Sequence, residues 1–331
     1  MMHVRRVIRG AALVATTAIA TLVASQGAMA EEVKVRFSWK LKGEYGFFYL
    51  GEQKGIYKDA GVTLKLGEGA GSQAALGSLI QGQEDVVILP GIFAISAIQK
   101  GMPVKIIALY QPESPIALIS HAEKAVKTPK DLEGKTIAHA VGETGTSYLN
   151  AFCEINQVDC GKVSKVQMDS QSRVPQFLQG QVDVVSVYKT NDLPVLEDKT
   201  GQTFPTLDMA EYGLAIPGMA VVASDAGIAE KATALKSFLA ANAKAIEMTR
   251  SDPAAATAAL KAVWQAGPSD KVVQRQIEAT SASIHAPSSG TPVGWVDEKA
   301  VGDALKLVGS TEEIGDPKPA STFFTNELLT Q

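Results

Sequence analysis

Cysteine and histidine are scarce in this sequence of 331 residues. Past residue 30 the only representatives are Cys153, Cys160, His121, His139 and His285. Neither residue type recurs at the spacing of a zinc finger, and no His-Glu-x-x-His pattern occurs. We therefore expect neither a metal site nor a cofactor.

Motifs of catalytic machinery are also missing. The sequence contains no Gly-x-Ser-x-Gly elbow, no P-loop with its lysine and no Gly-x-Gly-x-x-Gly fingerprint. Acidic residues are abundant, but no pair of them stands in a catalytic pattern. The sequence therefore gives no positive case for an enzyme, and we expect a protein without catalytic activity.

Long apolar runs are confined to the N-terminus. Three arginines within the first nine residues precede an apolar run over Ala11–Ala24 and a small-x-small site at Ala28–Ala30. This pattern predicts a secretory signal peptide over residues 1–30, too short in its apolar part to span a membrane. No cysteine stands at the cleavage site, so we expect a soluble periplasmic protein without a lipid anchor.

Excess positive charge is absent from the exported part. Past residue 30 the acidic residues outnumber the basic ones, which leaves no electrostatic footprint for nucleic acid.

Cys153 and Cys160 flank Glu154–Asp159, which we expect to form a helix end and its exit loop. An oxidising compartment permits a disulfide between the two cysteines. Two free thiols are the alternative.

One stretch of the sequence occurs twice. Leu79–Leu89 reads LIQGQEDVVIL and Phe177–Val187 reads FLQGQVDVVSV, with six of eleven positions identical at an offset of 98 residues. Each copy predicts a helix end, a glycine that ends the helix in the left-handed conformation, and a strand buried on both faces. We therefore expect two similar α/β halves with a ligand cleft between them.

Strands and helices alternate along most of the chain, which predicts mostly parallel sheets flanked by helices. After residue 223 the pattern becomes helical and Ala-rich, and we expect this tail to pack on the first half. The predicted strands are Val33–Trp39, Thr63–Leu66, Asp85–Leu89, Val104–Tyr110, Ile116–Ser120, Thr136–Ala140, Val163–Met168, Val182–Tyr188 and Met219–Ala223. The predicted tail helices are Ala229–Arg250, Pro253–Gln265, Ser269–Ile284 and Asp297–Val308.

Ligands of open α/β sheets lie beyond the carboxyl ends of the strands, and this rule selects candidate binding residues. The aromatic candidates would stack on a flat ligand. The small residues at helix starts offer free backbone N–H groups to an anion, with an arginine nearby. The candidates are Trp39, Tyr45, Ser72 and Tyr110 in the first half and Thr146, Arg173, Tyr188 and Asn191 in the second. The alternative for each aromatic residue is that it closes the end of its own core.

The segment Ser38–Gly61, SWKLKGEYGFFYLGEQKGIYKDAG, resembles a known family. It is similar to the periplasmic solute-binding proteins of ABC importers for nitrate, sulfonates, taurine and thiamine-pyrimidine precursors, the SsuA/THI5-like family. That family places a Trp after the first strand, then an aromatic helix, then Lys-Gly-aromatic-Phe-Lys-x-x-Gly, for which this chain has Lys54–Gly61. Further matches are Thr128–Lys135, Gly180–Asp183, Tyr212-Gly213 and Thr325–Leu328.

The resemblance implies an α/β protein with the two-lobe, type II periplasmic binding protein fold. Lobe 1 would comprise residues 31–115 plus 219–331, including the helical tail, and lobe 2 would comprise residues 116–218. Trp39, Tyr45, Ser72, Tyr188 and Asn191 would face the cleft. The pyrimidine-precursor binders often carry a histidine where this chain has Tyr45, which weakens that assignment.

The implied function is that of the substrate-binding component of an ABC importer. The protein would capture a small organic ligand in the periplasm and deliver it to the permease and ATPase complex at the inner membrane. Aromatic residues favour an aromatic or heteroaromatic, pyrimidine-like ligand, and the helix starts suit an acidic group on it. Binding of sulfonate, taurine or nitrate is the alternative, and an exported enzyme using the same cleft is the rival class. We expect a monomer that does not bind nucleic acid.

Overall fold

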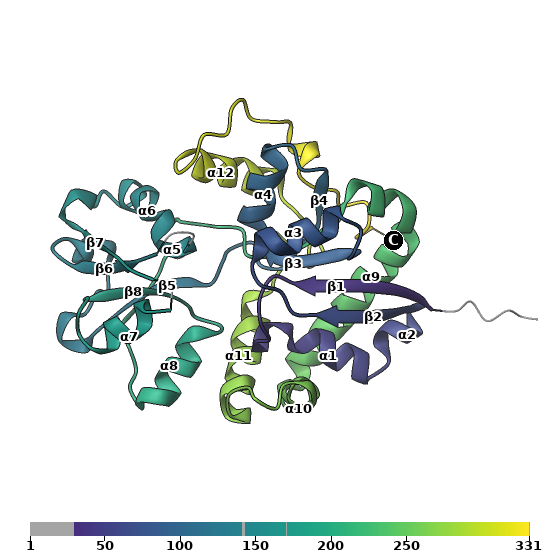
Figure 1. Ribbon diagram of the computed structural model, residues 1–331, viewed down its shortest axis with the longest axis horizontal. Helices are drawn as coiled ribbons and strands as arrows, with labels where there is room; N and C mark the ends of the chain where they lie inside the picture. Colours follow the sequence, from purple (N-terminus) through teal and green to yellow (C-terminus); the bar gives the residue numbers. More distant parts are fainter. Residues whose placement is uncertain (1–29, 141–142, 170, 331) are drawn as a thin grey trace, which may run out of the picture.

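The protein folds around two five-stranded sheets that lie side by side (Figure 1). The structure is a computed structural model that describes residues 30–140, 143–169 and 171–330. The predicted signal peptide therefore falls, except for Ala30, outside the described residues. No helix of the described part is long and apolar enough to cross a membrane.

The first sheet has the strand order β2-β1-β3-β10-β4, and we call it with its helices the first lobe. Its strands are β1 Glu31–Phe37, β2 Val62–Gly67, β3 Val86–Pro90, β4 Val104–Leu109 and β10 Met219–Ser224. β10 lies between β3 and β4 and is antiparallel to both, so the other four strands run in one direction. The C-terminal segment covers the β4 edge, since the Ile106 N–H donates to the Phe323 carbonyl at 2.9 Å.

The second sheet has the strand order β7-β6-β8-β5-β9, and we call it with its helices the second lobe. Its strands are β5 Ile116–Ser120, β6 Thr136–His139, β7 Ser164–Gln167, β8 Val184–Tyr188 and β9 Thr206–Asp208. Here β5 alone runs against the others. The two orders coincide when β1, β2, β3, β10 and β4 are matched with β6, β7, β8, β5 and β9. Each lobe is therefore a mostly parallel sheet with one reversed strand.

Helices flank both sheets. The first lobe carries the short turn η1 Gly43–Tyr45 and the helices α1 Gly46–Gln53, α2 Ile56–Asp59, α3 Ser72–Ile80 and α4 Gly91–Gln99, and the helical tail α9 Asp225–Ser251, α10 Pro253–Val263, α11 Asp270–Ser283 and α12 Glu298–Gly309. The second lobe carries α5 Thr144–Ser147, α6 Leu149–Ile155, α7 Arg173–Leu178 and α8 Asp192–Thr200. As expected, the tail packs on the first lobe, with α9 and α10 against α1 and α12 against α4. The sequence pattern had not predicted α8.

The repeated stretch forms the same unit in both lobes. Gly82 and Gly180 end α3 and α7 with positive φ values of 69° and 72°. The repeated aspartates directly precede β3 and β8, and each accepts a hydrogen bond from a backbone N–H of the neighbouring strand. Asp85 accepts from Lys34 at 2.8 Å and Asp183 accepts from Thr136 at 2.9 Å. The repeat therefore fixes where β1 pairs with β3 and where β6 pairs with β8.

The chain crosses between the sheets twice, between β4 and β5 and between β9 and β10. The two crossing segments are bonded to each other through Gln111, whose carbonyl accepts the Gly218 N–H at 2.9 Å and whose side chain accepts the Met219 N–H at 3.0 Å. A Cβ at Gly218 would lie 2.8 Å from the Gln111 Cβ, so glycine permits this close approach. One buried apolar cluster continues from the first lobe through Ile116 and Ile216 into the second.

A candidate ligand site between the lobes

Glu44 reaches from the first lobe to the second. Its carboxylate accepts a hydrogen bond of 2.7 Å from the Asn191 side chain, and the Lys42 ammonium lies 3.6 Å from its other oxygen. The turn η1, which carries Glu44, packs against α11, and the Gly43 N–H donates a hydrogen bond to Gln276 Oε1 at 3.1 Å. A Cβ at Gly43 would lie 2.3 Å from the Gln276 Cβ. Glycine at position 43 therefore brings the Glu44 carboxylate to the boundary between the lobes.

Asn191 is the counterpart of Glu44 in the second lobe, at the start of α8. Its amide nitrogen donates to Glu44 and, at 3.1 Å, to the Thr190 hydroxyl, while its backbone carbonyl accepts from the Gln276 side chain at 2.9 Å. Because the carboxylate of Glu44 needs a donor, the amide nitrogen must face it and the amide oxygen must face away. That oxygen, Oδ1, is buried and has no hydrogen-bond partner among the described residues.

Tyr188 ends β8 beside this junction. The Lys42 ammonium lies 5.7 Å from the centre of the Tyr188 ring, within cation–π range. The Tyr188 hydroxyl lies 3.5 Å from the Thr144 hydroxyl. Burial raises the pKa of Tyr188 above its ordinary value, so the phenol stays protonated. For Lys42, burial lowers the pKa, but the carboxylates of Glu44 and Asp192 outweigh it and hold the pKa above its ordinary value. The ammonium therefore stays charged.

A further contact joins the lobes through α8 and α11. Arg275 on α11 forms an ion pair with Glu197 on α8. Gln276, next to it, binds Gly43 with its oxygen and Asn191 with its nitrogen, and it is 3% exposed. Figure 1 shows the two helices facing each other across the lobe boundary. The described arrangement is thus one in which the lobes contact each other through polar side chains.

Thr146 and Arg173, which we expected to attract an anion, surround a carboxylate of the protein itself. Glu143 accepts hydrogen bonds from the backbone N–H groups of Gly145 at 2.7 Å and Thr146 at 2.8 Å. It also accepts from the hydroxyls of Ser186, at 2.5 Å, and Thr146. Arg173 donates to the Ser186 carbonyl at 3.0 Å and lies 3.9 Å from Glu143. The free N–H groups predicted at this helix start are therefore already occupied.

The remaining predicted residues lie in the first lobe. Burial first, and then the neighbouring Glu44 carboxylate, raise the pKa of Tyr45, so its hydroxyl lies close to the junction. Tyr45 and Tyr110 are 2% and 1% exposed in its apolar core. The Tyr45 ring stacks on Phe37 with centroids 3.9 Å apart, and the Tyr110 hydroxyl accepts from Asn242 at 2.8 Å. Trp39 is 46% exposed. Ser72 begins α3 but does not cap it, since the N-cap is Gly71 and no side-chain cap bond forms.

Around Glu44 the structure thus brings Tyr188 and Asn191 of the second lobe together with Lys42 and Gln276, which were not among the predicted residues. Lys42 and Glu44 follow the end of β1, so the rule that ligands lie beyond strand ends applied to them as well. Gln276 carries no such signal, because it lies within a tail helix. Glu143 precedes a run of small residues, where an acidic N-cap is common.

The predicted disulfide between Cys153 and Cys160 is present and joins α6 to the turn that follows it. Among the described residues no three histidine, cysteine or acidic side chains lie together as a metal site would require.

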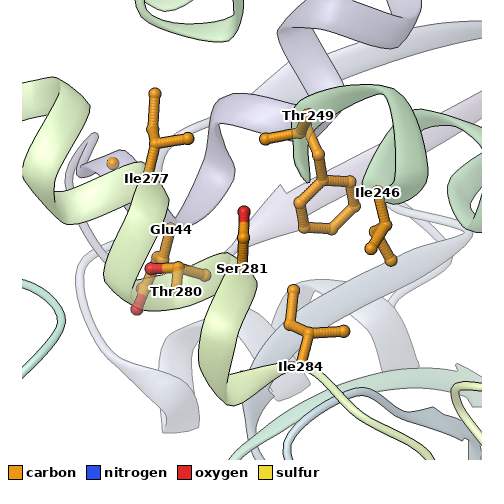
Figure 2. Close-up of a pocket in the computed structure, with 9 residues that line it drawn as sticks. Glu44, Ile246, Thr249, Ile277, Thr280, Ser281 and Ile284 are labelled. Atoms are coloured by element: carbon orange, nitrogen blue, oxygen red, sulfur yellow. The ribbon is translucent and has the colours of Figure 1, made fainter. Parts of the chain in front are cut away.

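A small cavity lies behind Glu44, between η1, α9 and α11 (Figure 2). Its volume is about 10 Å³, close to what one water molecule needs and far below the several hundred Å³ of a small-molecule site. The hydroxyls of Thr249 and Thr280, which line it, have no partner among the described residues. A second hollow of about 230 Å³ lies beside it on the outer surface, where Arg250 and Glu278 line it. Neither cavity is lined by residues of the second lobe.

Comparison with known proteins gives one family and many similar structures. The family model described as NMT1/THI5 like matches residues 43–256. The aliphatic sulphonate-binding protein SsuA of Escherichia coli is similar with a TM-score of 0.66 and 16% identity, over 85% of this chain and 86% of that one. The nitrate-binding protein NrtA of Synechocystis PCC 6803 is similar with a TM-score of 0.65 and 12% identity, over 91% and 87%.

A third structure, the alkanesulfonate-binding protein SsuA of Xanthomonas axonopodis pv. citri bound to MOPS, has a TM-score of 0.62 and 15% identity, over 84% and 91%. No curated protein sequence matches the chain. At these identities the similar structures establish the fold, and they confirm the predicted two-lobe periplasmic binding protein architecture.

Proposed function

Because this chain belongs to the NMT1/THI5-like family, we propose that it is the substrate-binding component of an ABC importer, which captures a small organic ligand and delivers it to a permease. The observation that carries this proposal is the junction of Glu44, Asn191 and Gln276, where polar side chains of both lobes meet. A ligand held there touches both lobes at once. Such a ligand binds the closed arrangement better than an open one, which is what drives closure.

The two lobes of the proposed closing movement comprise residues 31–115 with 219–331 and residues 116–218. The crossing segments, joined through Gln111, are the natural hinge, because only two short stretches of chain connect the sheets. Export to the periplasm follows from the proposed signal peptide over residues 1–30. The proposed partners are the ligand and the permease and ATPase complex, and the proposed cleft has no catalytic role.

We propose an aromatic or heteroaromatic ligand. The Tyr188 ring, half-buried at the end of β8, supplies a flat apolar surface beside the polar junction. Trp39, exposed at the end of β1, supplies a second ring that can be recruited when ligand is present. Sulfonate or nitrate is the second candidate, suggested by the ligands named for the similar structures. The occupation of the Thr146 helix start by Glu143 argues against it.

A thermal-shift screen of the mature protein tests this proposal. The panel contains pyrimidines, flavins, aromatic acids, taurine, alkanesulfonates and nitrate, and hits are followed by calorimetric titration. A ligand that binds only the folded state raises the melting temperature, by an amount that grows with ligand concentration. We expect saturable binding of one compound class without chemical change of the compound. Conversion of a bound compound by the pure protein would contradict the proposal and favour an enzyme.

A further inference from the structure

We propose that the ligand carries an N–H donor group, uncharged or cationic, which binds the unpartnered amide oxygen of Asn191, and that the site discriminates against oxyanions. This inference rests on the proposed function and specifies the chemistry of its ligand. Two observations carry it: the state of Asn191 and the charge of the groups around it.

The first observation is the amide oxygen of Asn191. The residue is 2% exposed, its nitrogen is held by Glu44 and Thr190, and its backbone is held by Gln276, so the side chain cannot turn its oxygen to another protein donor. Leaving a buried acceptor unpaired is unfavourable, because the group has lost its hydrogen bonds to water. A ligand donor recovers this free energy, whereas a carboxylate, sulfonate or nitrate presents only acceptors to the oxygen. Asn191 therefore favours a donor and rejects an oxyanion.

The second observation is the local balance of charge. The ammonium of Lys42 forms an ion pair with Glu44 at 3.6 Å and is also close enough to Asp192 to feel its charge. These two carboxylates hold the pKa of Lys42 above its ordinary value. Its charge is therefore already compensated and is not free for an anionic ligand. The charge of Arg173 is balanced by the Glu143 carboxylate at 3.9 Å, and one terminal nitrogen donates to the Ser186 carbonyl. Its Nε is buried without a partner among the described residues. An oxyanion would meet more negative than positive charge at this junction.

Four compounds with the same ring test the inference: benzamide, benzamidine, benzoate and benzenesulfonate. Benzamide offers a neutral N–H donor, benzamidine a cationic one, and the other two offer only oxyanion acceptors. Binding to the mature, disulfide-bonded protein is measured by NMR titration at millimolar concentration. We expect the two donors to bind at least about tenfold more tightly than the two oxyanions, the difference that an unpaired buried acceptor implies.

Two variants and a control localise the effect. Asn191→Ala is expected to weaken the two donor compounds about five- to tenfold and to leave the oxyanions unchanged. Glu44→Gln keeps an acceptor for the Asn191 nitrogen but removes a negative charge, so it is expected to weaken the binding of cationic benzamidine more than that of neutral benzamide. Asn150→Ala, at an exposed position of α6, is the matched control and is expected to bind like the unaltered protein. Circular dichroism of each variant confirms that it is folded.

Three results would overturn the inference. They are oxyanions that bind as well as the donors, an Asn191→Ala variant that keeps its full affinity for benzamide, and a protein that binds none of the four compounds. The first two would leave the proposed function standing, since a ligand would still be bound. The third removes only the donor rule, because the wider thermal-shift screen decides separately whether the protein binds a small molecule.

Discussion

Each lobe places a glutamate in the loop that follows the first strand of its parallel set, and the two lobes use it differently. Glu44 follows β1 and extends across the boundary to Asn191. Glu143 follows β6, the matching strand, and turns back to bind the first N–H groups of its own α5. The difference lies in what each loop meets: the Glu44 turn is pressed onto α11, whereas Glu143 finds donors within its own lobe.

This contrast shows how one fold unit serves both stability and binding. Glu143 satisfies four donors and is 9% exposed, so it acts as part of the interior of the second lobe. Glu44 has an ion pair with Lys42 of its own lobe and a hydrogen bond from Asn191 of the other lobe, so its contacts depend on whether the lobes are together. Substitutions at the two positions should therefore affect different properties, the first mainly stability and the second mainly closure.

The largest effect is expected for Glu143→Ala. The substitution leaves two backbone N–H groups and the Ser186 hydroxyl without an acceptor and removes the carboxylate nearest to Arg173. We expect a loss of about 3 kcal/mol in the free energy of unfolding, measured by urea denaturation. Glu154→Ala, at an exposed position of α6, is the control and should change stability by less than about 0.5 kcal/mol. A loss below about 1 kcal/mol for Glu143→Ala would contradict its structural role.

Removing the disulfide should affect the second lobe next most strongly. The disulfide joins Cys153 and Cys160, which are seven positions apart in the sequence, and the first lobe contains no disulfide. Loop-closure entropy predicts that Cys153→Ser with Cys160→Ser lowers the free energy of unfolding by about 2 kcal/mol. Urea denaturation compares three samples: the double variant, the unaltered protein in oxidising buffer and the unaltered protein in reducing buffer. The last two differ only in the disulfide and so measure the same loss of stability independently. Equal midpoints for all three samples would argue against stabilisation by this bond.

The repeated aspartate gives a pH test of the second lobe. Burial would raise the pKa of Asp183, but hydrogen bonds from Lys124 and Thr136 outweigh it and lower the pKa from its ordinary value of 3.8 to about 2. Because the folded-state pKa is depressed, the stabilisation is present above about pH 4 and is lost as the pH falls toward 2. Asp183→Asn should therefore cost about 1 kcal/mol at pH 7 and clearly less near pH 2, where about half of the Asp183 carboxyls are protonated.

The measurement is urea denaturation of this variant and of Asp198→Asn, an exposed control on α8, between pH 7 and pH 2. A stability difference between Asp183→Asn and the unaltered protein that stays constant over this range would show that Asp183 is not the titrating group.

The smallest change in stability, but the clearest change in shape, is expected for Glu44→Ala. The substitution removes the bond from Asn191 and so favours separation of the lobes by about 1 kcal/mol, or a factor of about five in the closed population. Small-angle X-ray scattering of the ligand-free protein should report a larger radius of gyration. Global unfolding should change by less than about 1 kcal/mol. An unchanged radius of gyration together with a large loss of stability would contradict the role of Glu44 in closure and would show that it stabilises the fold instead.

Much of the fold was predictable because it is encoded locally. The duplicated stretch, with its glycine and aspartate, predicted the helix and strand unit of each lobe. Gly82 and Gly180 adopt the positive φ that this prediction required. The reversed strand of each sheet was less visible, because Met219–Ser224 and Ile116–Ser120 are as apolar as the parallel strands. Strand direction depends on which segments cross between the lobes, and a window of sequence does not carry that information.

The site was less predictable than the fold for a related reason. The rule of strand ends selected Tyr188 and Asn191, which lie at the lobe boundary, but it cannot tell which side chains of a loop turn outward. Tyr45 turns into the core and stacks on Phe37, while its neighbour Glu44 turns to the other lobe. Gln276, 85 residues from Asn191 in the sequence, joins the site only through packing of the helical tail.

The most direct test is a crystal structure of the mature protein with the tightest ligand from the screen. We predict that the ligand lies between the lobes, with its ring against Tyr188 and an N–H group within hydrogen-bonding distance of the Asn191 amide oxygen, while Glu143 keeps its bonds to α5. A ligand bound in the outer hollow near Arg250, or an anionic group that displaces Glu143 from the Thr146 N–H, would contradict this placement.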